Sequence, residues 1–185
     1  MGEQQLSRMR VCLTGVVFLA EWAHLIWEHL HGGVVRHHIL HRPELPAISN
    51  WWGALLLPAL AWFLLGRIHR RMVSRADQDR VPSKPTVGVI VGFVGALTCG
   101  ILLAASFTYH YDALASYLFQ GALLLALLLP VYRAECVLGF VLGMTPTFGA
   151  LLPTAVGSLI AALSAVMHLA VRPVFARLRT RLSRR

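Results

Sequence analysis

Residues 86–109 read TVGVIVGFVGALTCGILLAASFTY, an apolar run without a charged residue or a histidine. A helix needs about 20 mostly apolar residues to cross the hydrocarbon core of a bilayer. The rest of the 185-residue chain agrees with this reading, because it is 57% hydrophobic and only 14% charged, with a mean hydropathy of +0.64. Soluble domains usually carry about 25% charged residues. The sequence therefore predicts an integral membrane protein.

Five further apolar segments flank this run, at residues 11–30, 51–66, 113–132, 134–148 and 150–171. The last two belong to one apolar block that is too long for a single span. Its centre reads Thr145-Pro-Thr-Phe-Gly149, and proline and glycine there predict a break between two short helical arms. We expect an all-α membrane bundle of about six transmembrane helices. Residues 1–171 would form one domain, followed by a basic tail at residues 172–185.

Small residues in these segments indicate packing. Gly88 with Gly92, and Gly139 with Gly143, form GxxxG pairs that allow helices to approach closely. The three cysteines lie far apart in apolar stretches and predict free thiols. Ser49 and Asn50 precede the second apolar segment as natural helix caps.

The distribution of charge predicts the topology. The net charge is +9, from 17 basic and 8 acidic residues. The basic residues lie between and after the apolar segments, which indicates the positive-inside rule and argues against nucleic-acid binding. The loop at residues 67–84 is the most basic and should face the cytoplasm. With six spans the N-terminus and the basic tail fall on the same side, so we expect an N-in, C-in chain.

The composition also suggests the source. Lys84 is the only lysine among the 17 basic residues, a bias typical of GC-rich bacterial genomes. A cleaved signal peptide is not expected, since Glu21, His24 and Glu28 interrupt the first apolar run. We expect a multi-pass protein of the bacterial inner (cytoplasmic) membrane.

Ionisable residues crowd the first apolar segment. Glu21, His24, Glu28 and His31 are spaced 3, 4 and 3 residues apart, which places them on one stripe of a helix. Charged groups inside a bilayer are costly, so such a stripe should face protein or water. The stripe also contains two Glu-x-x-His pairs, a spacing used in helical di-metal sites. In those sites the ligands come from several helices, whereas one helix supplies them here.

The predicted topology gathers more candidates at the outer face. His37, His38 and His41 follow the first segment, on a helical turn or a folded loop, and His110 and Asp112 lie at the turn after residue 109. Several histidines, or histidine with a carboxylate, form catalytic zinc or non-haem iron sites. The expected metal ligands are His24, His31, His37, His38, His41 and His110. Glu21, Glu28 and Asp112 are the expected catalytic groups.

These residues predict a metal-dependent membrane enzyme that acts on a lipid-like or apolar substrate, with zinc or iron as cofactor. One alternative is a small metal-ion or proton-coupled transporter, in which a polar path would continue inward from Glu21 toward Glu135 or His168. Another is a non-catalytic subunit of a membrane complex, and a homo-oligomer is compatible with all three. Glu135 and His168 predict either a second site or simple anchoring contacts. Signature motifs of nucleotide-binding proteins, serine hydrolases and zinc proteases are missing from the sequence.

Overall fold

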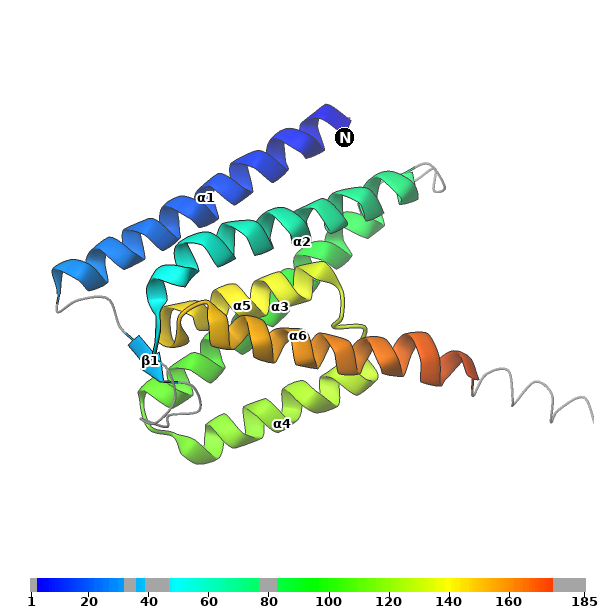
Figure 1. The fold of residues 1–185 in the computed structure, drawn as a ribbon. Coiled ribbons are helices and arrows are strands. Elements are labelled where there is room, and N and C mark those ends of the chain that lie inside the picture. Colours follow the sequence, from blue (N-terminus) through cyan, green and yellow to red (C-terminus); the bar gives the residue numbers. More distant parts are fainter. Residues whose placement is uncertain (1–2, 32–35, 39–46, 77–82, 175–185) are drawn as a thin grey trace, which may run out of the picture.

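The computed structural model describes residues 3–31, 36–38, 47–76 and 83–174. It confirms an all-α membrane bundle (Figure 1). The helices are α1 (Glu3–Leu30), α2 (Gly53–Ala76), α3 (Ser83–Thr108), α4 (Asp112–Leu128), α5 (Ala134–Phe148) and α6 (Leu151–Ala165). A π-helical turn, η3 (Val166–Val171), continues α6, and a 3-10 turn, η2 (Asn50–Trp52), precedes α2.

Four helical stretches in the described part of the chain are long and apolar enough to cross a membrane. They are Gln4–Leu30, Asn50–Ser74, Val87–Thr108 and Leu151–Val174. The other two helices are shorter, with 17 residues in α4 and 15 in α5. Apolar side chains such as Val16 and Leu19, 62% and 67% exposed, cover the outside of the bundle. This outward-facing apolar surface is the one expected of a protein solvated by lipid.

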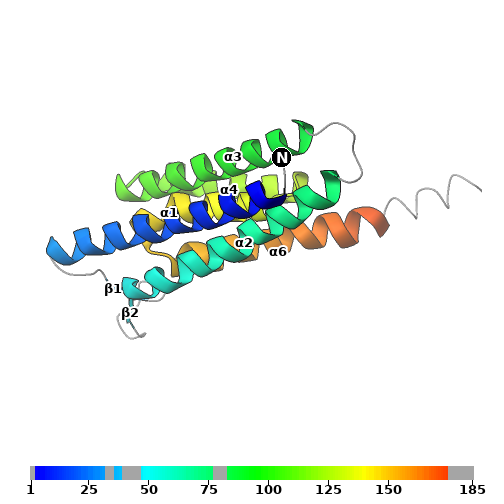
Figure 2. The ribbon, with the colours of Figure 1, turned by 90° about the horizontal axis from the view of Figure 1, so that it is seen from above.

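A short antiparallel hairpin joins α1 to α2, formed by β1 (Arg36–His38) and β2 (Ala47–Ser49). His37 pairs with Ile48 in this ladder. The backbone at His37 and His38 is therefore extended, which excludes the helical turn allowed by the sequence. Figures 1 and 2 place this hairpin, the end of α1 and the turn between α3 and α4 at the same end of the bundle.

Helix α5 occupies the middle of the bundle, with α3 and α6 against it (Figure 1). Glycines allow the backbones of α3 and α5 to touch. A Cβ added at Gly139 would overlap the carbonyl oxygen of Phe93, and one added at Gly143 would press on that of Leu97. The helix ends at Phe148, and Gly149 takes a positive φ of 68° before α6 begins. The chain thus breaks inside the predicted Thr145–Gly149 motif.

Helix α2 is longer than its apolar segment, because it continues through the arginines after Gly66 to Ala76. Buried apolar residues line one side of it, at Leu57, Ala61, Leu64 and Ile68. Two hydrophobic clusters form around these residues and the facing side of α5. Helix α1 lies at the edge of the bundle and packs mainly on α2.

Candidate functional site

Glu21 is the most unusual residue of α1, because it is only 3% exposed on a helix that shows most of its surface to lipid. Its carboxylate lies against Gly53, where α2 begins, and a Cβ added there would overlap Oε1 of Glu21 and approach Ala150. This Oε1 is buried and has no hydrogen-bond donor among the described residues. A buried carboxylate oxygen without a donor is costly unless a proton or a cation satisfies it.

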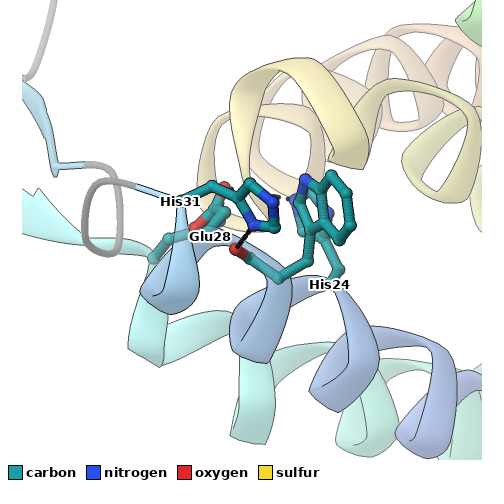
Figure 3. A network of polar contacts seen from close by, with 5 residues as sticks. His24, Glu28 and His31 are labelled. Carbon is teal, nitrogen blue, oxygen red and sulfur yellow. Dashed lines mark hydrogen bonds and ion pairs between the residues drawn. The ribbon is translucent and has the colours of Figure 1, made fainter.

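About two helical turns further on, Glu28 receives two hydrogen bonds from a buried amide. Nδ2 of Asn50 donates to Oε1 of Glu28 at 3.1 Å and to Oε2 at 3.2 Å. Nε2 of His24 lies 3.2 Å from the same Oε1, at ion-pair distance but without the alignment of a hydrogen bond. Figure 3 shows His24 and Glu28 projecting to the same side of α1. We call Glu21, His24, Glu28 and Asn50 the outer polar group, after the side of the membrane that the charge distribution predicts for this end of the bundle.

His31 completes the predicted stripe in sequence, but its ring is engaged with its own helix. Its Nδ1 lies 2.9 Å from the carbonyl oxygen of Trp27, and its ring stacks on the Trp27 indole at a centroid distance of 3.7 Å. Figure 3 places it beyond Glu28 at the end of α1. The stripe therefore divides into the buried Glu21, the half-buried His24 and Glu28, and an exposed, stacked histidine.

The remaining predicted ligands are at the same end of the bundle or outside the described residues. His110 and Asp112 are exposed at the turn between α3 and α4, where His110 has a positive φ of 57°. His37 and His38 contribute backbone to β1, and their side chains are outside the description, as is all of His41. Within the described ranges, no group of three or more His, Cys, Asp or Glu side chains is arranged to hold a metal ion.

Asn50 has a different role in the structure from the one that the sequence predicts. It was expected to cap α2, whereas its side chain is buried and binds a carboxylate of α1. The sequence offered one signal, since an asparagine between Ser49 and two tryptophans is a polar residue at the start of an apolar segment. Its partner lies 22 positions away, a separation that periodicity within one helix cannot detect.

A second buried acid lies toward the other end of α2. Nη2 of Arg71 donates to Oε1 of Glu135 at 2.6 Å, and Glu135 is 1% exposed. His168 does not complete this pair. Its ring nitrogens lie 3.0 Å from the carbonyl oxygen of Ser164 and 3.4 Å from that of Leu128. Thus Glu135 forms an ion pair, while His168 is an anchoring contact at the end of α4.

The buried side of α2 is apolar between the two acids. Gly53, which faces Glu21, and Arg71, which binds Glu135, are 18 residues apart on α2, or about 27 Å at 1.5 Å per residue. The hydrocarbon core of a bilayer is about 30 Å thick. The buried side chains of α2 between these positions, at Leu57, Ala61, Leu64 and Ile68, are all apolar.

Searches against protein-family models, curated proteins and solved structures find no match for this chain.

Proposed function

We propose that the protein is a metal-dependent enzyme of the bacterial inner membrane, with its site at the outer face and a lipid-like substrate. The observation that carries this proposal is the acceptor-rich character of the outer polar group. Glu21 brings a buried oxygen without a donor, and Nε2 of His24 lies 3.2 Å from a carboxylate oxygen of Glu28. A divalent cation satisfies such acceptors.

The residues present fit part of a metal site. Catalytic zinc sites use three protein ligands, with combinations of His and Glu among them, and leave one position open. Glu21, His24 and Glu28 do not form a three-ligand group by themselves. His24 and Glu28, from adjacent turns of α1, would supply two ligands, with Glu21 close to them in the stripe. His37, His38 and His41 would add ligands from the segment that joins α1 to α2, with His110 and Asp112 in supporting roles. The bound zinc or iron ion would activate water or oxygen for the reaction.

Asn50 and Glu28 have a defined role in this proposal. Both oxygens of Glu28 accept hydrogen bonds from the Asn50 amide, which fixes the orientation of the carboxylate. Metal ligands and catalytic carboxylates are commonly oriented by such outer partners. Glu28 is thus held in one position, where it serves as a ligand or accepts a proton from a reacting group.

The apolar buried side of α2 favours a one-sided site over the alternative of a transporter. A proton or ion relay from Glu21 to Glu135 needs polar groups or water through the membrane. Along that direction α2 presents Leu57, Ala61, Leu64 and Ile68 to the interior, and two hydrophobic clusters surround them. The lipid-exposed surface of α1 beside the site favours a substrate that reaches it from the bilayer.

Elemental analysis of the purified protein tests the proposal. We expect about one equivalent of zinc or iron in the wild-type protein, and its loss in His24→Ala, Glu21→Gln and His38→Ala. His69→Ala is the matched control, because His69 lies near the other end of α2 and should leave the metal content unchanged.

Absence of metal from the wild-type protein, together with an unfolding temperature that chelators leave unchanged, would contradict the proposal. Flux of protons or metal ions in proteoliposomes that is lost in Glu21→Gln would support the transporter instead. Purification only together with another membrane protein would support the role of a non-catalytic subunit.

A further inference from the structure

A cavity of about 420 Å³ lies between α3, α4, α5 and α6. Its wall is mostly apolar, with Ala96, Leu125, Phe140 and Ile160 among the residues that line it. Small-molecule sites span about 300–1,000 Å³, so this cavity is in the lower part of that range. A space of this size between membrane helices suits one narrow apolar chain better than two.

One end of the cavity is polar. Arg133 and Glu135, where α5 begins, both line it. Oε1 of Glu135 is bound by Arg71, but its Oε2 is buried without a hydrogen-bond partner among the described residues. Arg133 forms no ion pair within the described part of the chain. This end of the cavity therefore presents the guanidinium of Arg133, which has no anionic partner among the described residues, while the Glu135 carboxylate lies buried within the wall.

We propose that this cavity binds one single-chain phospholipid. The acyl chain fills the apolar part, and the phosphate pairs with Arg133. Basic pockets between membrane helices on the cytoplasmic side are suited to anionic lipid head groups, and the arginines of α2 place this end of the bundle on that side in the predicted topology. The site is independent of the outer polar group, since it lies toward the opposite end of α2.

Two native cysteines report on this cavity. Cys99 and Cys136 line it, whereas Cys12 is exposed on α1 and serves as the internal control. The experiment measures modification of each thiol by an uncharged, apolar maleimide, read by peptide mass spectrometry on the full chain in detergent. Lysophosphatidylglycerol should slow modification of Cys99 and Cys136 at least about fivefold and leave Cys12 unchanged.

The contribution of Arg133 is measured with a second lipid. A monoacylglycerol with the same chain keeps the hydroxyl groups and lacks the phosphate. Hydrogen bonds to charged groups are worth enough to change affinity about tenfold or more. Half-maximal protection of Cys99 should therefore need about ten times more monoacylglycerol than lysophosphatidylglycerol. In Arg133→Gln the two lipids should protect equally.

Filling the cavity provides a variant that leaves both charges in place. Gly95 lines the cavity on α3, and an added Cβ there meets no atom within 4 Å. Gly95→Leu should abolish protection of Cys99 by the lipid. Gly121→Leu is the matched control, because Gly121 is equally open but lies outside the cavity wall, and it should keep the protection.

Three results would overturn the proposal. The first is an equal decrease in the modification rates of Cys12 and Cys99, which would mean that the lipid coats the whole protein and does not bind in the cavity. The second is equal protection by both lipids in the wild-type protein, which removes the role of the phosphate. The third is full protection in a folded Gly95→Leu variant, which places the lipid elsewhere.

Discussion

At the scale of single residues, the contact between Glu21 and Gly53 joins α1 to α2 at the candidate site. Gly53 is buried, and the carboxylate occupies the space where any other residue would carry its Cβ. Because the carboxylate fills this space, a larger residue at position 53 would displace it. The glycine is thus required for the position of the acid rather than for a special backbone angle.

The first prediction follows from this contact. Gly53→Ala should lower stability by about 1–3 kcal/mol, the usual cost of overpacking, although alanine is the better helix former. Thermal unfolding in detergent measures the loss. Gly15→Ala is the control, because a Cβ at Gly15 on α1 meets nothing within 4 Å. Shortening the acid in Gly53→Ala/Glu21→Asp should recover part of the loss, and no recovery would contradict the assigned contact.

The ion pair of Arg71 and Glu135 gives a second prediction. Arg71→Leu leaves a carboxylate buried without its cation, and breaking a buried pair in this way costs about 3–5 kcal/mol. The loss should be nearer the lower figure, because the Arg71 side chain is 29% exposed. The double variant Arg71→Leu/Glu135→Leu should be more stable than Arg71→Leu alone. A double variant with the summed losses of the two single variants would argue against direct coupling.

Residue patterns predicted only part of these contacts. The stripe of Glu21, His24 and Glu28 follows from helical spacing, so the sequence alone places all three on one side of α1. The partners of Glu28 and Glu135 could not be predicted, because Asn50 and Arg71 reach them from other elements of the fold. Spacing within one helix does not show which residues of a second helix face it.

At the scale of elements, the central contact of the bundle is the crossing of α3 and α5. Both GxxxG pairs predicted close packing, but the structure distinguishes them. Gly139 and Gly143 meet the backbone of α3, whereas a Cβ at Gly88 would enter open space. In lipid, helices associate through close backbone approach and van der Waals contact rather than through the hydrophobic effect. The position of α5 therefore depends on its glycines.

The third prediction is that Gly139→Ala destabilises the bundle much more than Gly95→Ala does. The added methyl group at Gly139 overlaps the carbonyl of Phe93, and the helices must separate to admit it. Gly95 lies on α3 with open space around it and controls for the general effect of removing a glycine. The midpoint of thermal unfolding in detergent compares the two. Equal midpoints would mean that the helices adjust without cost.

The apolar runs predicted where the helices lie. They predicted only some of the positions at which the helices end. The break at Gly149 agrees with the sequence, because a glycine with positive φ ends a helix there. The extension of α2 to Ala76 was not expected from hydropathy. Arginine is a good helix former, so a change in polarity does not by itself end a helix. The β1–β2 hairpin is too short for its alternation of residues to be recognised.

At the scale of the whole molecule, the buried acids Glu21 and Glu135 lie toward opposite ends of an apolar bundle. The ends also differ in charge, because the arginines Arg67, Arg70 and Arg71 gather near the end of α2 that holds Glu135. Under the positive-inside rule this end faces the cytoplasm. The orientation remains a prediction of the sequence.

Cysteine labelling tests the orientation. Asp112→Cys, at the exposed turn before α4, should react with a membrane-impermeant maleimide added to intact cells. Ser74→Cys, exposed near the end of α2, should react only after the membrane is opened. Both substitutions belong in a chain whose three native cysteines are replaced by serine. The reverse pattern of labelling would invert the topology and place the outer polar group inside.

The peripheral position of α1 also has a consequence for biosynthesis. When α1 leaves the ribosome it carries Glu21 without the neighbour that covers this side chain, and an acidic residue at the centre of a lone helix costs about 2.5–3.5 kcal/mol to insert. The neighbour that buries the Glu21 carboxylate is Gly53, and it is the first residue of the next helix to be synthesised. Helices α1 and α2 should therefore enter the membrane as a pair, with the first helix waiting in the translocon for the second.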